Sequence, residues 1–331
     1  MKSVGENAPY DALTPELILD GLDANGWQTT GKLFPLNSYE NRVYQVGVYE
    51  QDREFDIVVK FYRPGRWSKE QILEEHSFSF ELVDDEIPVV PPLCRSECSI
   101  FEAGNFMFSV FDKVGGRAPN LEDDSVLRWM GRLIARTHLK GSIRRYDVRP
   151  QIDVQQFGFG PSRDVLASGH LPEGLSDVYD GLIQRALSEI QDRFSGRGDS
   201  RDIRLLGDCH IGNVLVSDDT MCFVDLDDSV MGPSIQDLWM LLSGDRESMQ
   251  RQLREILKGY EQFRDFDYSE VLLIEPLRTL RMINYAGWLA NRWNDPAFQT
   301  AFPWFSTQRF WEEHMNHIRE QISAMDEPFS I

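Results

Sequence analysis

Three residues in one short segment have the types and the spacing needed for phosphoryl transfer. Asp208, Asn213 and Asp225 lie within residues 203–228, which read IRLLGDCHIGNVLVSDDTMCFVDLDD. An Asp followed five residues later by an Asn is the spacing of loops in which the Asp accepts a hydroxyl proton and the Asn binds a metal ion. Asp225 ends the next apolar run, where a second metal ligand would lie. Such oxygen ligands suit Mg²⁺ held together with the phosphates of ATP.

Short strands would position these three residues. The apolar runs IRLL, VLV and MCFVDL predict strands, while GDCHIGN and SDDT predict a loop and a tight turn between them. Asp208, Asn213 and Asp225 would then lie at neighbouring strand ends. The alternative is that the acids of this segment are turn and surface residues of an acidic chain. We adopt that interpretation for Asp218 and Asp219, because SDDT has ordinary turn chemistry.

A lysine and a glutamate far upstream could complete such a site. Lys60 interrupts an apolar run in FDIVVKFYR, and strand periodicity leaves open whether it points to solvent or to a phosphate. The following WSKEQILEEHSFSFELV predicts a helix that is capped by Ser68 and carries Glu74 and Glu75. A strand lysine with a helix glutamate is the arrangement that orients a lysine on the α and β phosphates, although most helix glutamates are solvated.

The composition favours a two-domain enzyme that binds neither nucleic acid nor membrane. The 331 residues are 41% hydrophobic, which supports a sizeable core, and a strand followed by glycines places a domain boundary at about residue 115. A formal charge of −20 argues against a protein that tracks nucleic-acid phosphates. No stretch approaches the ~20 apolar residues of a membrane span, and the first residues lack a signal-peptide core. The four cysteines lack metal or disulfide spacing, so we expect free thiols in the cytoplasm.

The periodicity predicts a mixed first domain and a mainly helical second one. In the first domain, a helix at residues 14–22 capped by Thr14 precedes a strand, a turn at residues 37–41 and a second strand. In the second domain, helical spacing occurs at residues 127–138, 179–194, 247–263, 268–292 and 308–324. Pro276 should kink or split the helix that contains it. Residues 149–172 hold glycines and prolines without clear periodicity, and we expect a loop with short turns.

Three features of the second domain have both a structural and a functional interpretation. His138 closes an apolar helix face, and we interpret it as a core residue. Asp237, in the first turn of a helix beginning near Ser234, either complements the helix dipole or braces the backbone amides of the 206–213 loop. The aromatic residues of the last helices could line an acceptor cleft, but core packing is the more ordinary role.

Together, these segments resemble the bacterial stress-response kinases of the aminoglycoside/choline kinase-like branch. The resemblance rests on LNSYENRVYQ, VVKFYRP, QILEEH, GDCHIGN, FVDLDD, GPSIQDLWMLL, LIEPLR and DPAF followed by FPW, and it covers nearly the whole chain. It implies an α+β, bilobal protein-kinase-like fold, with a small antiparallel-sheet N-lobe over residues 1–114 and a larger helical C-lobe over residues 115–331. The implied enzyme is a cytoplasmic serine/threonine protein kinase that uses Mg²⁺ and ATP under envelope or oxidative stress, and we expect a monomer.

The resemblance assigns the reacting and metal-binding groups. It implies that Asp208 accepts the proton of the serine or threonine hydroxyl of a protein substrate. Asn213 and Asp225 are implied to bind magnesium. One position departs from the family pattern, because the branch usually reads His-Gly-Asp and this chain has Leu206 in place of the histidine. That histidine chiefly braces the loop, so its loss bears on loop rigidity more than on chemistry, and His210 could assist Asp208 from the other side.

The resemblance also assigns the nucleotide-binding groups. Ser38 falls in the turn that covers the nucleotide, and Lys60 is implied to bind the phosphates. Glu75 is a better partner for Lys60 than Glu74, because in the branch the glutamate directly precedes the position filled here by His76.

Two alternatives remain open on sequence grounds. The same fold could phosphorylate a small hydroxylated molecule, and the charge of −20 would favour a cationic one. Leu206 also leaves open an ATP-binding scaffold without turnover, although Asp208, Asn213 and Asp225 are all present.

Overall fold

The structure, a computed structural model, describes residues 8–51, 53–195, 202–217, 220–327, 329 and 331. The described residues belong to two compact units. The first comprises Met1–Pro119 with Gly212–Asp227, and the second comprises Asn120–Ile211 with Asp228–Ile331. Residues 212–227, which lie beyond the boundary expected near residue 115, therefore group with the first unit. The turn predicted at Asp218 and Asp219 lies outside the described residues.

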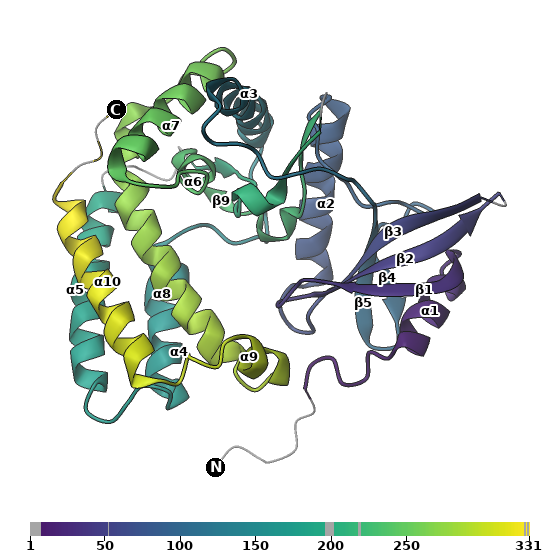
Figure 1. Ribbon diagram of the computed structural model, residues 1–331, viewed down its shortest axis with the longest axis horizontal. Coiled ribbons are helices and arrows are strands. Elements are labelled where there is room, and N and C mark those ends of the chain that lie inside the picture. The colour runs from purple at the N-terminus through teal and green to yellow at the C-terminus, as the bar shows by residue number, and fades with distance from the viewer. Residues whose placement is uncertain (1–7, 52, 196–201, 218–219, 328, 330) are drawn as a thin grey trace. The chain divides into compact units, whose positions relative to one another are not determined.

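An antiparallel sheet of five strands forms the centre of the first unit (Figure 1). Its strand order is β1-β2-β3-β5-β4, and each neighbouring pair is antiparallel. The predicted strand, turn and strand are confirmed as β1 and β2, and the strand that carries Lys60 is confirmed as β3. The bounds are Gln28–Leu36 (β1), Arg42–Glu50 (β2), Arg53–Phe61 (β3), Phe101–Ala103 (β4) and Phe106–Asp112 (β5).

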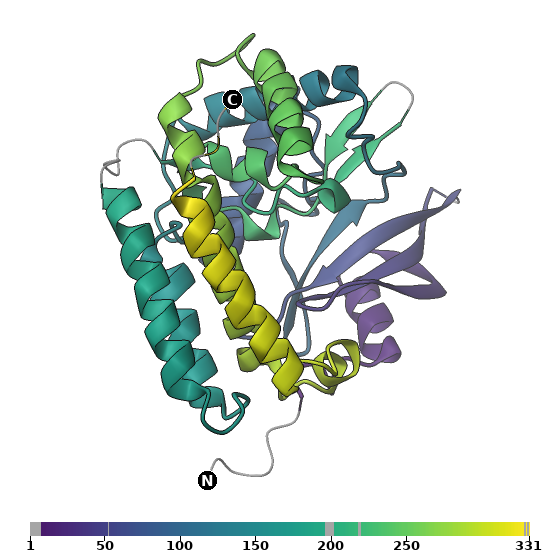
Figure 2. The same ribbon diagram turned by 60° about the vertical axis from the view of Figure 1, so that its left-hand side comes forward.

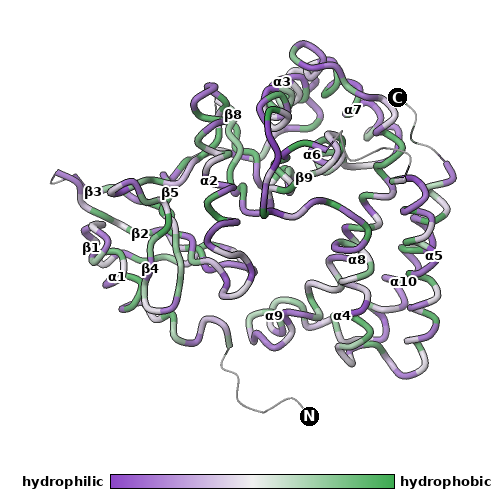
Figure 3. Tube along the Cα trace, turned by 180° about the vertical axis from the view of Figure 1, so that it is seen from behind, coloured by the Kyte–Doolittle hydropathy of each residue, from purple (hydrophilic) through white to green (hydrophobic). Residues whose placement is uncertain are grey.

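Apolar residues hold helix α1 against this sheet. Helix α1, Pro15–Ala24, begins as predicted, with the Thr14 side chain accepting a hydrogen bond from the Leu17 amide at 3.2 Å. Its buried residues Ile18 and Leu22 belong to the same core as the strand residues, and in Figure 3 hydrophobic stretches run along the strands. β-branched and aromatic residues favour such half-buried strands.

Helix α2, Lys69–Asp84, carries buried polar residues in the first unit. A capping box fixes its start: Ser68 accepts from the Gln71 amide at 3.2 Å, and the Gln71 side chain accepts from the Ser68 amide at 3.0 Å. The cap predicted at Ser68 is therefore confirmed. Glu75 and His76 lie on the buried face of the helix. The first turn of α2 is thus capped on both sides, and Glu75 lies inside the unit.

A short hairpin places Asn213 beside the segment that contains Asp225. Strands β7 (Val214–Val216) and β8 (Met221–Phe223) pair antiparallel, with Val214 opposite Phe223. The Val224 amide then donates to the Asn213 carbonyl at 3.0 Å. Asn213 and Asp225 therefore flank the same end of one hairpin, as the strand pattern predicts for these two residues.

The second unit is mainly helical. Helix α3 packs on α7, α4 packs on α8, and α10 packs on both α5 and α8 (Figure 2). A two-stranded sheet pairs β6 (Ile203–Arg204) with β9 (Met231–Gly232). The helices are α3 (Asp124–Gly141), α4 (Gly160–Ser168), α5 (Ser176–Ser195), α6 (Ile235–Trp239), α7 (Arg246–Tyr260), α8 (Ile274–Arg292), α9 (Pro296–Ala301) and α10 (Gln308–Met325).

The loop predicted at residues 149–172 is wrong in part. The structure forms a π-helical turn at Gln155–Phe159 followed by α4. Pro161 lies in the first turn of α4, where a residue without an amide hydrogen costs nothing. Gly158 allows close packing here, since a Cβ there would lie 2.4 Å from a methyl carbon of Leu187, and that side chain would have to shift. The residues that suggested a break therefore start and pack a helix.

Pro276 splits the helix of its region rather than bending it. A 3₁₀ helix, Tyr268–Leu273, precedes α8, and Pro276 lies in the first turn of α8. The short helix α9 was not expected from the periodicity. Within the described ranges, no helix combines the length and the apolar character needed to cross a membrane.

Candidate active site

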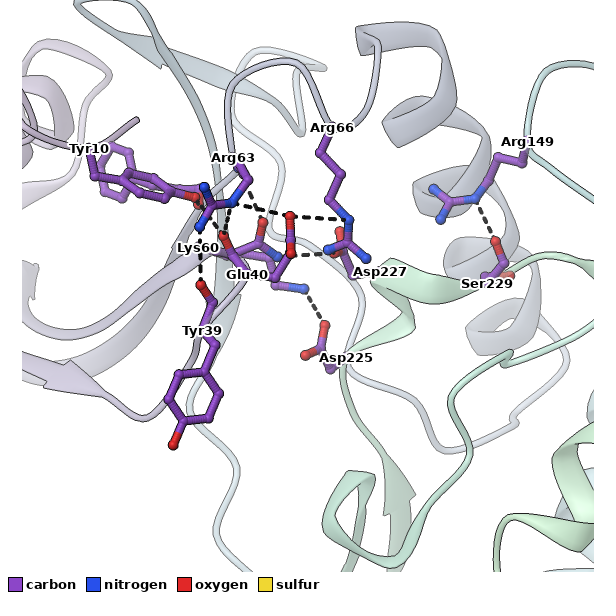
Figure 4. Close-up of polar contacts among 12 residues, drawn as sticks. Tyr10, Tyr39, Glu40, Lys60, Arg63, Arg66, Arg149, Asp225, Asp227 and Ser229 are labelled. Atoms are coloured by element: carbon purple, nitrogen blue, oxygen red, sulfur yellow. Dashed lines mark hydrogen bonds and ion pairs between the residues drawn. The ribbon is translucent and has the colours of Figure 1, made fainter. Parts of the chain in front are cut away.

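Lys60 and Asp225 form an ion pair within the first unit. The Lys60 Nζ lies 2.5 Å from the Asp225 Oδ1 (Figure 4), and Lys60 is only 6% exposed. Burial disfavours the charged form of this lysine, but the negative charges of Asp225 and Asp227 outweigh that effect and raise the pKa of Lys60. The side chain therefore points away from solvent and stays an ammonium ion, and its binding of a phosphate stays a prediction.

Glu75 lies near Lys60 without being its ion-pair partner. It is buried on α2, and its charge also contributes to raising the pKa of Lys60, whereas Glu74 is only partly buried. Among the described residues, the ion pair of Lys60 is with Asp225. The sequence favours Glu75 over Glu74 as the partner of Lys60, and Glu75 is the more buried of the two. A shift of Lys60 from Asp225 toward a phosphate would leave Asp227 and Glu75 as buried counter-charges near it.

The backbone of Asp225 is in an unusual conformation. Its φ is +60°, in the left-handed region that residues other than glycine adopt at a cost. The side chain is 49% exposed although it pairs with a buried lysine. Backbone strain concentrates at functional positions, and this signal cannot be read from the sequence.

The donors at this end of the hairpin suit a hard divalent cation. Asp225 supplies a carboxylate and Asn213 an amide oxygen, which are the ligand types that Mg²⁺ prefers. In the part of the chain that the structure describes, no group of three or more His, Cys, Asp or Glu residues could hold a metal ion. A cation bound here would need oxygens from water or phosphate as well, which is how Mg²⁺ binds with nucleotides.

A buried network that the sequence reasoning missed surrounds Asp227. Its carboxylate accepts from the Asn41 side chain at 3.0 Å and pairs with the Arg66 guanidinium at 2.5 Å. The Asn41 amide oxygen accepts in turn from the Arg63 backbone amide at 3.2 Å. Asn41 ends the turn that contains the partly buried Ser38. The network therefore ties that turn to the segment that follows Asp225.

Glu40 extends the network between two arginines. Its Oε1 lies 3.2 Å from the Nε of Arg63 and 3.8 Å from the Nε of Arg66 (Figure 4). The buried carboxylates and guanidiniums offset one another's charge, which buried ions require. One feature of the sequence could have pointed to Asp227 as part of the site: it lies two residues beyond Asp225, after a buried strand.

Asp208 lies between two basic side chains in the second unit. The Arg281 Nη1 donates to the Asp208 Oδ1 at 2.8 Å, and the His210 Nε2 lies 3.4 Å from the Oδ2. The preceding Gly207 has a φ of +86°, and a Cβ there would lie 2.0 Å from the carbonyl oxygen of Asp228. Only glycine fits this position. The carboxylate of Asp208 is partly exposed and can meet a hydroxyl group.

A buried carboxylate braces the loop at Leu206. The side chain of Asp237 accepts hydrogen bonds from the amides of Leu206 at 2.8 Å and Gly207 at 2.9 Å. It also lies 3.0 Å from the Nε2 of His138, whose Nδ1 lies 2.9 Å from the Tyr260 hydroxyl. Of the two interpretations of Asp237, the structure therefore shows the brace.

His138 orients that brace. Burial lowers the pKa of His138, and the hydrogen bond to Asp237 opposes this without cancelling it, so the imidazole is neutral near pH 7. A neutral ring that donates from Nε2 to Asp237 accepts at Nδ1 from Tyr260. The core assignment of His138 is confirmed by its burial, and its support of Asp237 was not foreseen.

Replacing Asp237 by Asn should lower the free energy of unfolding by about 3 kcal/mol. In either orientation, the amide nitrogen of Asn would face at least one N–H donor of Leu206, Gly207 or His138. Urea denaturation measures the loss, and turnover should fall with it. Asp245→Asn is the control, because Asp245 caps α7 through the Ser248 amide and Asn caps helices equally well. Equal stability of the two variants would contradict the brace.

The aromatic residues of the second unit mostly pack inside it. Trp311 and Phe298 are fully buried, which confirms the core role expected for most of them. Tyr285 and Trp304 are exposed by more than a third, and Tyr285 stacks on Trp288 along α8. Tyr285 and Trp304 are therefore the two aromatic residues named here that reach the surface.

Comparison with known proteins identifies the family. The model of the phosphotransferase enzyme family matches residues 32–274. The serine/threonine protein kinase RdoA of Salmonella typhimurium is 40% identical over 319 residues, with 96% of this chain and 95% of that protein covered. Stress response kinase A of Escherichia coli K12 matches with the same identity and coverage.

The chain belongs to the phosphotransferase enzyme family. Its relatives place it in the stress response kinase A group of that family. The family predicted from the sequence motifs and the prediction of a phosphotransferase are confirmed. The predicted roles of Asp208, Asn213, Asp225, Ser38, Lys60 and Glu75 stay predictions.

Solved structures support the fold. The amicoumacin kinase hAmiN, in complex with AMP-PNP, Ca²⁺ and amicoumacin, aligns with a TM-score of 0.73 at 18% identity and covers 96% of both chains. A microcompartment-associated aminopropanol kinase aligns with a TM-score of 0.69 at 17% identity, covering 95% of this chain and 100% of that one. With the five-stranded antiparallel sheet and the helical second unit, the predicted α+β, protein-kinase-like fold class is confirmed.

Proposed function

We propose that this phosphotransferase transfers the γ-phosphoryl group of ATP, with Mg²⁺, to serine or threonine hydroxyls of a protein substrate. The observation that carries the acceptor class is the 40% identity, over nearly the full length of both chains, to a relative named as a serine/threonine protein kinase. The small-molecule kinases among the solved structures are below 20% identical and support the fold alone. A cytoplasmic, monomeric enzyme remains our expectation from the sequence.

Asp208 is the group proposed to act on the acceptor. In-line transfer breaks the bond between the γ-phosphorus and the bridging oxygen of ATP and forms a bond to the acceptor oxygen. The acceptor proton passes to a base, and a carboxylate on a braced loop is suited to that task. The brace at Leu206 and Gly207 lets the loop keep its shape without the histidine that the family usually has there.

Residues of the first unit are proposed to hold the nucleotide. The Lys60 ammonium would bind the α and β phosphates, with Glu75 as a buried counter-charge, and the turn that contains Ser38 would cover the phosphates. Asp225 and Asn213 would bind the divalent cation, which neutralises charge on the phosphates when bound. This makes the first unit, with its sheet and residues 212–227, the nucleotide lobe and assigns the acceptor to the second unit.

Incubating the enzyme with γ-labelled ATP, Mg²⁺ and a bacterial lysate should label polypeptides on serine and threonine. Phosphoamino-acid analysis of the labelled bands identifies the acceptor, and Asp208→Asn serves as the inactive control. Chelation of the metal should remove the label. Label confined to the low-molecular-weight fraction would overturn the protein acceptor in favour of a small-molecule kinase. Nucleotide binding without any label in either fraction would indicate a scaffold.

A further inference from the structure

Arg281 contacts Asp208 from outside the catalytic loop. It lies on α8, 73 residues beyond Asp208, and donates from Nη1 to the Asp208 Oδ1 at 2.8 Å. No sequence motif pointed to it. Its side chain is 49% exposed, whereas the Asp208 side chain is 24% exposed. A charged group that holds the proposed base and also faces solvent is in a position to meet a second anion.

The surroundings of Arg281 fix where its guanidinium lies. Leu280 and Ile283, one residue before and two residues after Arg281 on α8, are buried in the second unit, so α8 is anchored on that side. The Arg281 Nη1 also lies 3.9 Å from the Met240 sulfur. On the loop side, the Gln236 side chain donates to the Gly207 carbonyl at 3.0 Å. Both ends of the ion pair are thus held by buried structure.

The guanidinium has donors that Asp208 does not use. Among the residues that the structure describes, the hydrogen bonds of the Arg281 side chain all involve Nη1. Nε and Nη2 carry three further N–H groups in the same plane, and this fork matches the oxygens of a phosphoryl group. Arg281 can therefore hold Asp208 and bind a second anion at the same time. A lysine ammonium paired with the same carboxylate has no planar fork of N–H groups to offer the second anion.

We propose that Arg281 is a catalytic residue that binds a non-bridging oxygen of the γ-phosphoryl group during transfer while Nη1 holds Asp208. This rests on the proposed phosphoryl transfer. Negative charge spreads over the three equatorial oxygens of that group in the transition state, and a preorganised guanidinium stabilises it. Arginines supplied from outside the nucleotide site perform this role in other phosphoryl-transfer enzymes. The same side chain would keep the Asp208 carboxylate aimed at the acceptor hydroxyl.

Two substitutions test this role. Arg281→Met removes every donor and should lower kcat by on the order of 10²–10³-fold, with the KM for ATP changed less than about threefold. Arg281→Lys keeps a cation beside Asp208 but lacks the fork, and it should lose most of the same activity. Arg309→Met is the control, because Arg309 is an exposed arginine of α10 paired with Glu313. It should match the wild type.

A readout that needs no acceptor separates this inference from the proposed function. ADP with Mg²⁺ and aluminium fluoride mimics the transferring group, and both Arg281 variants should bind it at least about tenfold more weakly while binding ADP alone as the wild type does. If Arg281→Lys bound ADP with Mg²⁺ and aluminium fluoride as tightly as the wild type does, the proposed contact between Arg281 and the γ-phosphoryl group would be wrong. This holds even if Arg281→Met failed to fold. If polypeptides are never labelled but the fluoride affinity is lost, the protein acceptor fails and the role of Arg281 stands.

Discussion

Replacing Asp208 by Asn should reduce kcat by on the order of 10²–10⁴-fold, the range of general base catalysis, while ATP affinity stays within about threefold. The amide keeps the shape of the carboxylate, and its oxygen can still accept from Arg281 at the position of Oδ1. It cannot take up the proton of the acceptor. The bonds that brace the loop end on the backbone of Leu206 and Gly207, so they do not depend on this side chain.

Isothermal titration with ATP and steady-state assays on the labelled acceptor measure the two quantities separately. Asp245→Asn makes the same chemical change at an exposed helix cap and should leave both unchanged. A collapse of nucleotide affinity in Asp208→Asn, with turnover falling only in proportion, would contradict a base that acts on the acceptor. In that case Asp208 would belong with the nucleotide-binding groups.

The sequence predicts the parts of this site that depend on local spacing. The interval between Asp208 and Asn213 is a property of one loop, and the hairpin that carries Asn213 and Asp225 follows from two short apolar runs. The cap at Ser68 is visible for the same reason. Local rules also explain the failure at residues 149–172, where Pro161 could equally start a helix or end one.

The missing parts depend on contacts between distant segments. His138 supports Asp237 across 99 residues, and Asn41 reaches Asp227 across 186 residues. No periodicity specifies such partners. For Lys60, strand alternation allowed two directions, and the face of β3 that becomes buried is set by packing in the first unit. The positive φ of Asp225 is likewise visible only in the folded chain.

Asp225→Ala should abolish metal-dependent turnover, with a loss of at least about 10³-fold, or ~4 kcal/mol of transition-state stabilisation. The carboxylate is the charged member of the proposed cation site, and neither Asn213 nor water replaces its charge. Turnover measured across a range of Mg²⁺ concentrations checks this. Full activity of the variant would contradict the role of Asp225 as a metal ligand. Asp225→Asn should lose nearly as much activity, although Asn tolerates a φ of +60° better than Ala does.

The same substitution has a structural effect that must be separated from the chemical one. Removing Asp225 leaves the buried Lys60 ammonium without its ion-pair partner. We expect a stability loss of about 1–2 kcal/mol, below the 3–5 typical of fully buried pairs, because Asp225 is half exposed. Lys60→Met with Asp225→Ala removes both charges, so it should recover most of this stability yet remain inactive. A double-mutant cycle of unfolding free energies measures the coupling between Lys60 and Asp225. The dependence of turnover on Mg²⁺ concentration in the single variants tests the metal role of Asp225 separately.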